Sequence, residues 1–169
     1  RAFVLAGHVW MDLAAGEYRI GPGRDDRVWV EMTTPDPDDI ASCRATIEPK
    51  GRELLIATTG PRGGMKAVIE LPAHTDLHVQ LSAGELRLKG IRGSKNLSSW
   101  AGDVDVEVGA RDDYRTVHAS VTVGELSARP FDIRKEGFFS SFSWKGPGTC
   151  TLDARLTAGR GRFRNECDR

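Results

Sequence analysis

Apolar and polar residues alternate along most of the chain. Leu77, Val79 and Leu81 are each followed by a polar residue. The same period of two recurs in further segments: residues 9–13, 28–32, 45–47, 67–71, 86–89, 103–108 and 150–156. Because successive side chains of a strand point to opposite faces, each segment predicts a half-buried β-strand. A helical period is hard to find, and the acidic stretch 36–41 is expected to be a loop or one helical turn.

Glycine and proline gather between these segments. They cluster at residues 21–23, 60–64, 90–93 and 146–148. The 19 glycines and 8 prolines, spread in this way, suit many short strands rather than a linker between domains. A chain of 169 residues can also bury its own core without metal or disulfides.

We therefore expect one all-β domain over residues 1–169. Its parts are expected to be N-terminal strands in 1–64, a repeat-bearing part in 65–164 and a tail in 165–169. The N-terminal strands are expected to form a sheet or a sandwich.

A short pattern returns along the chain: a small residue, glycine, an acid, then alternating apolar and polar positions. Copies begin at Ala15-Gly16-Glu17, Ala83-Gly84-Glu85, Ala101-Gly102-Asp103 and Val123-Gly124-Glu125, with a degenerate last copy at Ala158-Gly159-Arg160. This spacing predicts a β-solenoid, in which stacked rungs bury together an apolar face that no single rung can bury. Residues 77–164 are expected to form these rungs as parallel strands. Gly84, Gly102 and Gly124 are expected at equivalent corners of successive rungs, because glycine tolerates a positive φ. An antiparallel sandwich is the alternative, since its hairpins also space glycine regularly.

The acids after the glycines are expected to face outward. Glu85, Asp103 and Glu125 would then stack as a ladder, and like charges in neighbouring strands repel unless Arg or Lys relieves them. A solubilising wall is the simpler interpretation of this ladder. Carboxylates of a carbohydrate-active β-helix enzyme are the alternative.

The balance of charge and the absence of known motifs exclude several classes of function. Lys+Arg and Asp+Glu both number 24, and this balance argues against a nucleic-acid binder. No apolar run approaches the roughly 18 residues of a membrane span. His74 and His78 lie about 13 Å apart on an extended strand, too far to share a metal ion. With no nucleotide or nucleophile motif either, we predict no catalytic, cofactor or metal site.

Two groups of residues are candidates for binding a partner. Trp10 and Trp29 have the opposite parity from the apolar residues around them, so both indoles are expected on an exposed face unless another layer covers it. Arg160, Arg162 and Arg164 line one strand face. This stripe would meet an anionic lipid or an acidic partner, or it would protect the edge of the last rung.

Phe138, Phe142 and Trp144 share a parity and are predicted to lie in the core. Cys150 and Cys167 are predicted to form a disulfide, because they are one rung apart in a solenoid or opposite each other in a hairpin. Such a bond would stabilise the fold by roughly 3 kcal/mol and would favour an oxidising compartment. Free thiols are the alternative.

The segment from Leu71 to Leu86 joins a Leu-Pro pair, an alternating strand and the small-Gly-acid pattern. The copies at Gly102 and Gly124 follow it, as does a late segment over 146–159. This arrangement resembles the bacterial putative-adhesin β-solenoid family, a domain of unknown function. The resemblance covers nearly the whole chain.

The likeness is strongest from about residue 65 to residue 164, and it departs from the pattern where Arg160 replaces the acid. The resemblance implies a β-helical bacterial protein that is exported or tethered to a membrane. It implies no catalytic residues.

We therefore expect a non-enzymatic binding or scaffold protein outside the cytoplasm, in the periplasm or at the cell surface. A membrane tether would lie in a segment ahead of Arg1. A protein or a membrane complex is the expected partner, with a surface glycan or an anionic lipid as further ligands and no nucleic acid. The alternatives are an accessory subunit of a larger membrane complex, docking through Trp10 and Trp29, and a carbohydrate-active enzyme.

Overall fold

The computed structural model describes residues 7–61 and 64–165. Within them, 11 strands form one mixed sheet, and short 3-10 turns are the only helical elements described. The shorter strands are β1 (His8–Leu13), β2 (Gly16–Pro22), β3 (Trp29–Thr33), β4 (Arg44–Lys50), β5 (Glu53–Thr59) and β6 (Lys66–Leu71). The longer strands are β7 (Asp76–Leu88), β8 (Lys95–Val108), β9 (Tyr114–Ala128), β10 (Ile133–Lys145) and β11 (Cys150–Asn165). The turns are η1 (Pro37–Ser42), η2 (Arg111–Asp113) and η3 (Arg129–Phe131). The predicted all-β fold class is confirmed.

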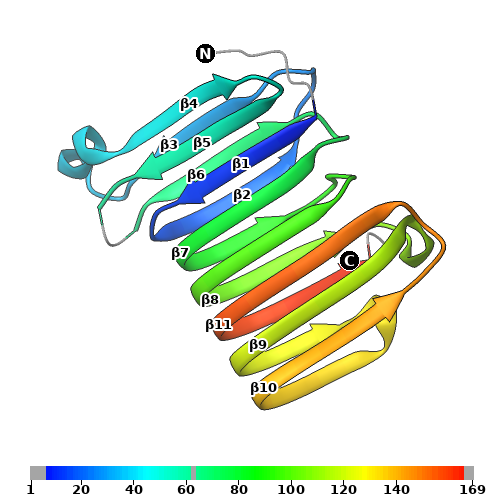
Figure 1. Cartoon of the computed structure of the whole chain (residues 1–169). Helices are drawn as coiled ribbons and strands as arrows, with labels where there is room; N and C mark the ends of the chain where they lie inside the picture. The colour runs from blue at the N-terminus through cyan, green and yellow to red at the C-terminus, as the bar shows by residue number, and fades with distance from the viewer. Residues whose placement is uncertain (1–6, 62–63, 166–169) are drawn as a thin grey trace.

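Each long strand bends at a glycine and continues in a second layer, so the sheet folds back over itself (Figure 1). At the bend of β8, Gly102 has a φ of 121°. A Cβ at this position would lie 1.8 Å from the backbone oxygen of Gly84 in β7. Glycine is therefore required both by its φ and by the close approach of the neighbouring corner.

The short strands repeat this geometry in pairs. β1 runs parallel to the first half of β7, and β2 runs parallel to the second half, where Gly16 pairs with Gly84. β5 and β6 pair in the same way with the far sides of β1 and β2. Two short strands therefore take the place of one long, bent strand.

The order of the strands in space differs from their order in the chain. β11 lies between β8 and β9, so Gly159 pairs with both Gly102 and Gly124. The expectation that Gly124 directly follows Gly102 in the stack is therefore wrong. Gly84 and Gly102 do pair directly.

The interior pairs are parallel, whereas the end strands are antiparallel. Leu86 in β7 pairs with Val104 in β8 in parallel register, which argues against the hairpins of a sandwich. β3, β4 and β10 each run antiparallel to their neighbours, and the sheet does not close. The expected uniform parallel stacking over residues 77–164 is wrong for β10, because the short turn η3 joins β9 to β10 and reverses the chain.

The core lies between the two layers and is filled by apolar side chains such as Leu13, Val106 and Phe163. Lys95 is also buried, and its Nζ donates to the Gly93 carbonyl (3.0 Å) and the Tyr114 hydroxyl (3.1 Å). Burial lowers the pKa of this lysine to about 8.

The aromatic residues of β10 divide between core and surface. Phe142 is buried and Trp144 is half-buried against the core, as predicted. Phe138 is 75% exposed, so its predicted core position is wrong. The alternation breaks at the bend, because Gly137 and Phe139 both have positive φ and re-aim the side chain between them.

Candidate functional site: an arginine-lined pocket

Charged side chains form rows across the outer face of the second layer. In one row, strand pairing places Glu85 beside Asp103, Asp103 beside Arg160, and Arg160 beside Glu125. The Nη2 atom of Arg160 lies 2.7 Å from Asp103 Oδ2. This hydrogen bond and the carboxylate charge raise the pKa of Arg160.

The row explains why the last repeat departs from the pattern. Because β11 is inserted between β8 and β9, its position after glycine lies between Asp103 and Glu125. An acid there would extend the pair Glu85 and Asp103 through β11 to Glu125, with like charges on four adjacent strands, whereas Arg160 separates Asp103 from Glu125.

The next positions of β11 carry Arg162 and Arg164. Arg162 pairs in register with Asp105 of β8 and Ser127 of β9. Asp105, however, is engaged diagonally by Arg164, whose Nε donates to Asp105 Oδ1 at 3.0 Å. Arg162 is exposed and has no ion pair with a described residue.

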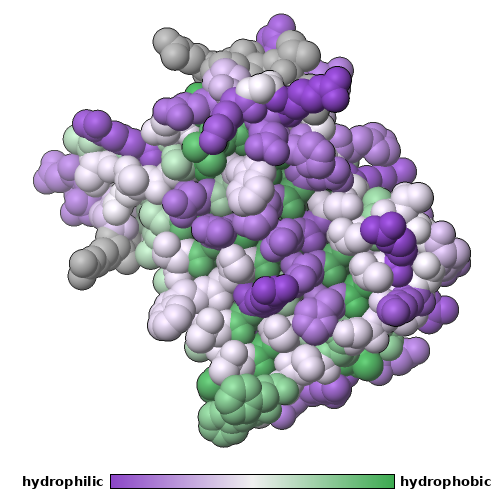
Figure 2. Space-filling model, viewed as in Figure 1, coloured by the Kyte–Doolittle hydropathy of each residue, from purple (hydrophilic) through white to green (hydrophobic). Residues whose placement is uncertain are grey.

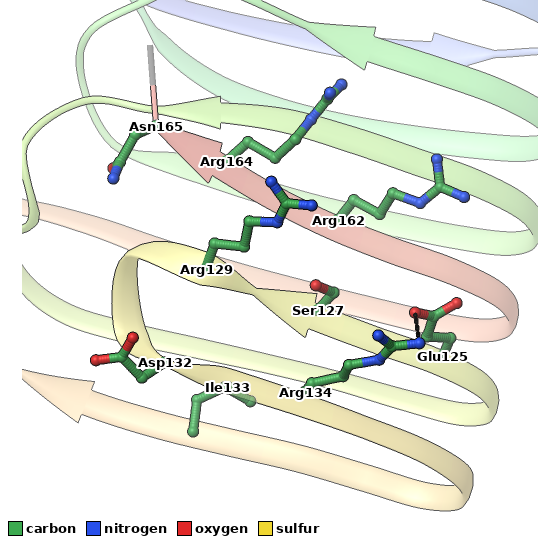
Figure 3. Close-up of a pocket in the computed structure, with 9 residues that line it drawn as sticks. All are labelled: Glu125, Ser127, Arg129, Asp132, Ile133, Arg134, Arg162, Arg164 and Asn165. Carbon is green, nitrogen blue, oxygen red and sulfur yellow. Dashed lines mark ion pairs between the residues drawn. The ribbon is translucent and has the colours of Figure 1, made fainter. Parts of the chain in front are cut away.

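Arg162 and Arg164 line a surface pocket together with Arg129 and Arg134 (Figure 3). These arginines come from β11, η3 and β10, and Arg129 points toward the strand that carries Arg162 and Arg164. The hollow measures about 650 Å³, a volume within the usual range of ligand sites. Four cationic side chains from three elements therefore line one hollow, together with the carboxylates of Glu125 and Asp132.

The four arginines differ in their partners. Arg134 Nη2 lies 2.9 Å from Glu136 Oε1 and 3.7 Å from Glu125 Oε1. Arg164 is held by Asp105. Neither Arg129 nor Arg162 forms an ion pair with a described residue. Two guanidinium groups can therefore bind an anion, and a guanidinium fork matches carboxylate, phosphate and sulfate geometry.

Sequence reasoning found part of this pocket. Arg162 and Arg164 lie in it, whereas Arg160 is outside its lining and is bound to Asp103. Arg129 and Arg134 were missed. Their place follows from the reversal at η3, which the period of two along each strand does not reveal.

The two predicted tryptophans are both exposed but do not form one patch. Trp10 is 42% exposed and stacks on His78 of β7, with ring centroids 3.7 Å apart. Trp29 is 51% exposed and belongs to β3, which pairs with β6 in the other layer. Because β1 and β3 are not neighbours, a single docking surface made by both indoles does not arise within one chain.

The remaining predicted features give no second site. No group of three His, Cys, Asp or Glu side chains in residues 7–61 and 64–165 is placed to hold a metal ion. Cys167 lies outside the described residues, so its disulfide with Cys150 stays a prediction. Cys150 and Cys43 form no disulfide with any described residue.

None of the helical turns in the described part of the chain has the length and apolar character of a membrane span.

No family model matches the sequence, and no curated protein sequence matches it. Solved structures do match. One is a putative cell adhesion protein from Clostridium sporogenes, with a TM-score of 0.56 and 15% identity over 96% of this chain and 94% of that chain. At this identity the likeness shows a shared all-β fold alone.

Proposed function

We propose that this protein is a non-enzymatic binding protein that recognises an anionic group on a macromolecular partner. The observation that carries the proposal is one pocket lined by four arginines and only two carboxylates, with no described carboxylate paired to Arg129 or Arg162. A bound anion would neutralise this gathered positive charge. Because Arg129 and Arg162 are exposed, each ion pair with the ligand contributes roughly 0.2–1 kcal/mol.

The fold is suited to presenting such a site. We propose that the parallel strands form a β-solenoid-type scaffold, in which the antiparallel strands β4 and β10 close the two ends. β11 is paired on both sides, with β8 and β9, so the strand that carries Arg162 and Arg164 is held in place. β9 leads into η3, and its pairing with β11 fixes where Arg129 begins that turn. A preorganised site loses little side-chain and backbone entropy on binding.

We further propose that the protein acts outside the cytoplasm, at a cell surface or in the periplasm. The resemblance to the putative-adhesin family supports this location. The name of the matched Clostridium structure, a putative cell adhesion protein, supports it also. The predicted disulfide between Cys150 and Cys167 would fit an oxidising compartment.

A second candidate function is an accessory subunit of a larger complex. Phe138 and Phe139 are 75% and 81% exposed at the end of the stack, where hydrophobic surface gathers over β10 (Figure 2). An exposed apolar patch of this kind is common where proteins meet other proteins. Co-purification from native membranes with and without Phe138→Ser/Phe139→Ser separates this role from anion binding, because the arginine pocket stays intact.

The proposed anion site is tested with three probes that differ in the source of the anion: polyglutamate, heparin and phosphatidylserine vesicles. We expect one of them to bind in a salt-sensitive manner, and Arg129→Gln/Arg162→Gln to weaken that binding at least tenfold. The matched control is Arg44→Gln/Arg115→Gln, which removes the same charge from two exposed arginines of β4 and β9 that lie outside the pocket. Equal loss in both double variants, or no binding by the wild type, contradicts the proposal.

A further inference from the structure

The outer face of the first layer differs from the arginine face. Trp100 projects from the middle of β8 and is 70% exposed, although β8 is held on both sides by β7 and β11. Its neighbours on this face are small hydroxyl residues, Ser82 of β7 and Thr157 of β11. A large indole exposed on a rigid strand among small residues does not contribute to the core.

A hollow of about 340 Å³ lies beside this indole. Asp12, Gln80, Ser98 and Arg155 line it, so strands β1, β7, β8 and β11 each contribute a hydrogen-bonding side chain. Together these groups offer carboxylate acceptors, a hydroxyl, an amide that both donates and accepts, and guanidinium donors. This mixture suits a ligand with many hydroxyl groups, each of which both donates and accepts.

The charge of the hollow further restricts the ligand. Arg155 forms an ion pair with Asp153 (3.0 Å), and Asp12 is the other acid nearby. The hollow therefore has no excess of positive charge, in contrast to the arginine pocket. An anionic ligand is not favoured here, and the complementary ligand is neutral and polar.

A second aromatic group lies on the same face. Trp10 stacks on His78, and both border a neighbouring hollow that contains Asn96 and Asp153. Strand pairing aligns Trp10 with His78 and His78 with Asn96, four residues before Trp100 in β8. Two strand spacings and four residues along a strand put the indoles roughly 16 Å apart.

We propose that this face, with Trp100 and Trp10 as its two aromatic groups, binds a neutral oligosaccharide. Sugar rings present an apolar face of C–H groups to an aromatic ring and hydroxyls around their rim, which matches an exposed indole surrounded by polar side chains. The separation of the indoles selects a chain of sugars rather than a single ring. The site faces away from the arginine pocket, so both ligands could be held at once and the protein would bridge them.

The test begins with the whole protein on an array of neutral oligosaccharides built from glucose, galactose, mannose and N-acetylglucosamine. We expect binding to at least one of them, with quenching of tryptophan emission on titration. Trp100→Ala should weaken that binding at least tenfold, and Trp10→Ala should weaken it for longer chains only. Because Trp100 is exposed, its variant should keep the wild-type melting temperature.

Two controls make the result specific. Trp29→Ala removes an indole that is also exposed, at 51%, but lies in the other layer, and it should leave the affinity unchanged. Arg129→Gln/Arg162→Gln should also leave it unchanged, so failure of this proposal is distinguishable from failure of the anion site. No bound neutral glycan, equal effects of Trp29→Ala and Trp100→Ala, or a change in sedimentation of the unliganded protein on Trp100→Ala would overturn it, the last by indicating a second protein chain as occupant.

Discussion

The centre of the stack and its β10 end use the same bend under different constraints. Gly102 in β8 and Gly137 in β10 have similar φ values, 121° and 110°. A Cβ on Gly102 would lie 1.8 Å from the Gly84 oxygen, whereas a Cβ on Gly137 would have no neighbour within 4 Å. The central glycine is therefore required by both backbone conformation and crowding, and the end glycine by conformation alone.

The residues next to the bends show the same difference. Pairing between strands forms one column of Ala83, Ala101, Ala158, Val123 and Phe138, in that order toward the end at β10. Alanine occupies the three central positions. Val123 follows in β9, the last strand with two neighbours, and the largest side chain, Phe138, lies in β10, where one side of the strand is free. The small-Gly part of the repeat is thus a requirement of stacking, and it is relaxed at the free end.

The largest loss of stability is expected from a substitution that disrupts a central bend. Gly102→Ala adds a methyl group against the Gly84 backbone in a left-handed conformation, so we expect a loss of about 4 kcal/mol or more in the free energy of unfolding. Gly137→Ala adds only the conformational strain and should cost about 1–2 kcal/mol. Urea denaturation of the two variants measures the contrast. Equal losses would show that the corners do not crowd one another.

The second effect compares two phenylalanines. Phe163 in β11 is fully buried, and Phe163→Ala should cost about 3–5 kcal/mol because it leaves a cavity. Phe138→Ala at the free end should change the free energy of unfolding by less than about 0.5 kcal/mol. Thermal and urea unfolding give both values. A large loss for Phe138→Ala would mean that another chain covers this end.

The third effect concerns the buried lysine of the centre. Burial lowers the pKa of Lys95 to about 8, whereas the unfolded chain keeps the value of 10.5. The unfolded state therefore holds more protons between these values, and stability should rise by about 2 kcal/mol from pH 7 to pH 9.5. Above pH 10 the raised pKa values of Tyr18 and Tyr114, caused by burial, should reverse the trend.

Lys95→Met is the matched variant for this effect. It should abolish the rise between pH 7 and pH 9.5 and should stabilise the fold at pH 7 by roughly 1–3 kcal/mol, because no buried charge remains. Its gain is limited by the Tyr114 hydroxyl, which loses a donor. Lys135 at the free end offers a control, since it is exposed and its Nζ donates to the Ser141 carbonyl. A similar pH profile in Lys95→Met and wild type would contradict the assignment.

The alternating strands and the glycine bends could be predicted from the sequence because both are local features of the chain. The period of two along β7 and β8 follows from burial of one face, and equivalent glycines follow from the bend that each strand must make. The insertion of β11 could not be predicted in this way. A parallel strand with this alternating pattern could pair between any two similar strands of the sheet. The order of the strands along the chain therefore does not determine their order in space.

The functional residues could likewise be predicted only where they follow a local pattern in the sequence. Arg162 and Arg164 were identified because they alternate within one strand, whereas Arg129 and Arg134 join them through η3 and the antiparallel β10. Trp100 was missed because its sequence neighbours are polar or small, and an isolated exposed aromatic residue leaves no period. Its significance appears only when the neighbouring strands are in place.

The smallest change in stability is expected from substitutions of the arginines that separate like charges, one in the centre of the sheet and one at its β10 end. Arg160 lies between Asp103 and Glu125 in the centre, whereas at the end Glu125 pairs directly with Glu136 and Arg134 reaches both. Arg160→Glu should lower the urea midpoint slightly, because an acid would then lie directly between Asp103 and Glu125, and Arg160→Gln should have a smaller effect. Both effects should nearly vanish in roughly 1 M NaCl, where the Debye length is about 3 Å. Arg134→Gln should give a similar salt-dependent loss, since it removes the cation between Glu125 and Glu136. A loss that persists at high salt would assign Arg160 a packing role instead of a role in charge separation.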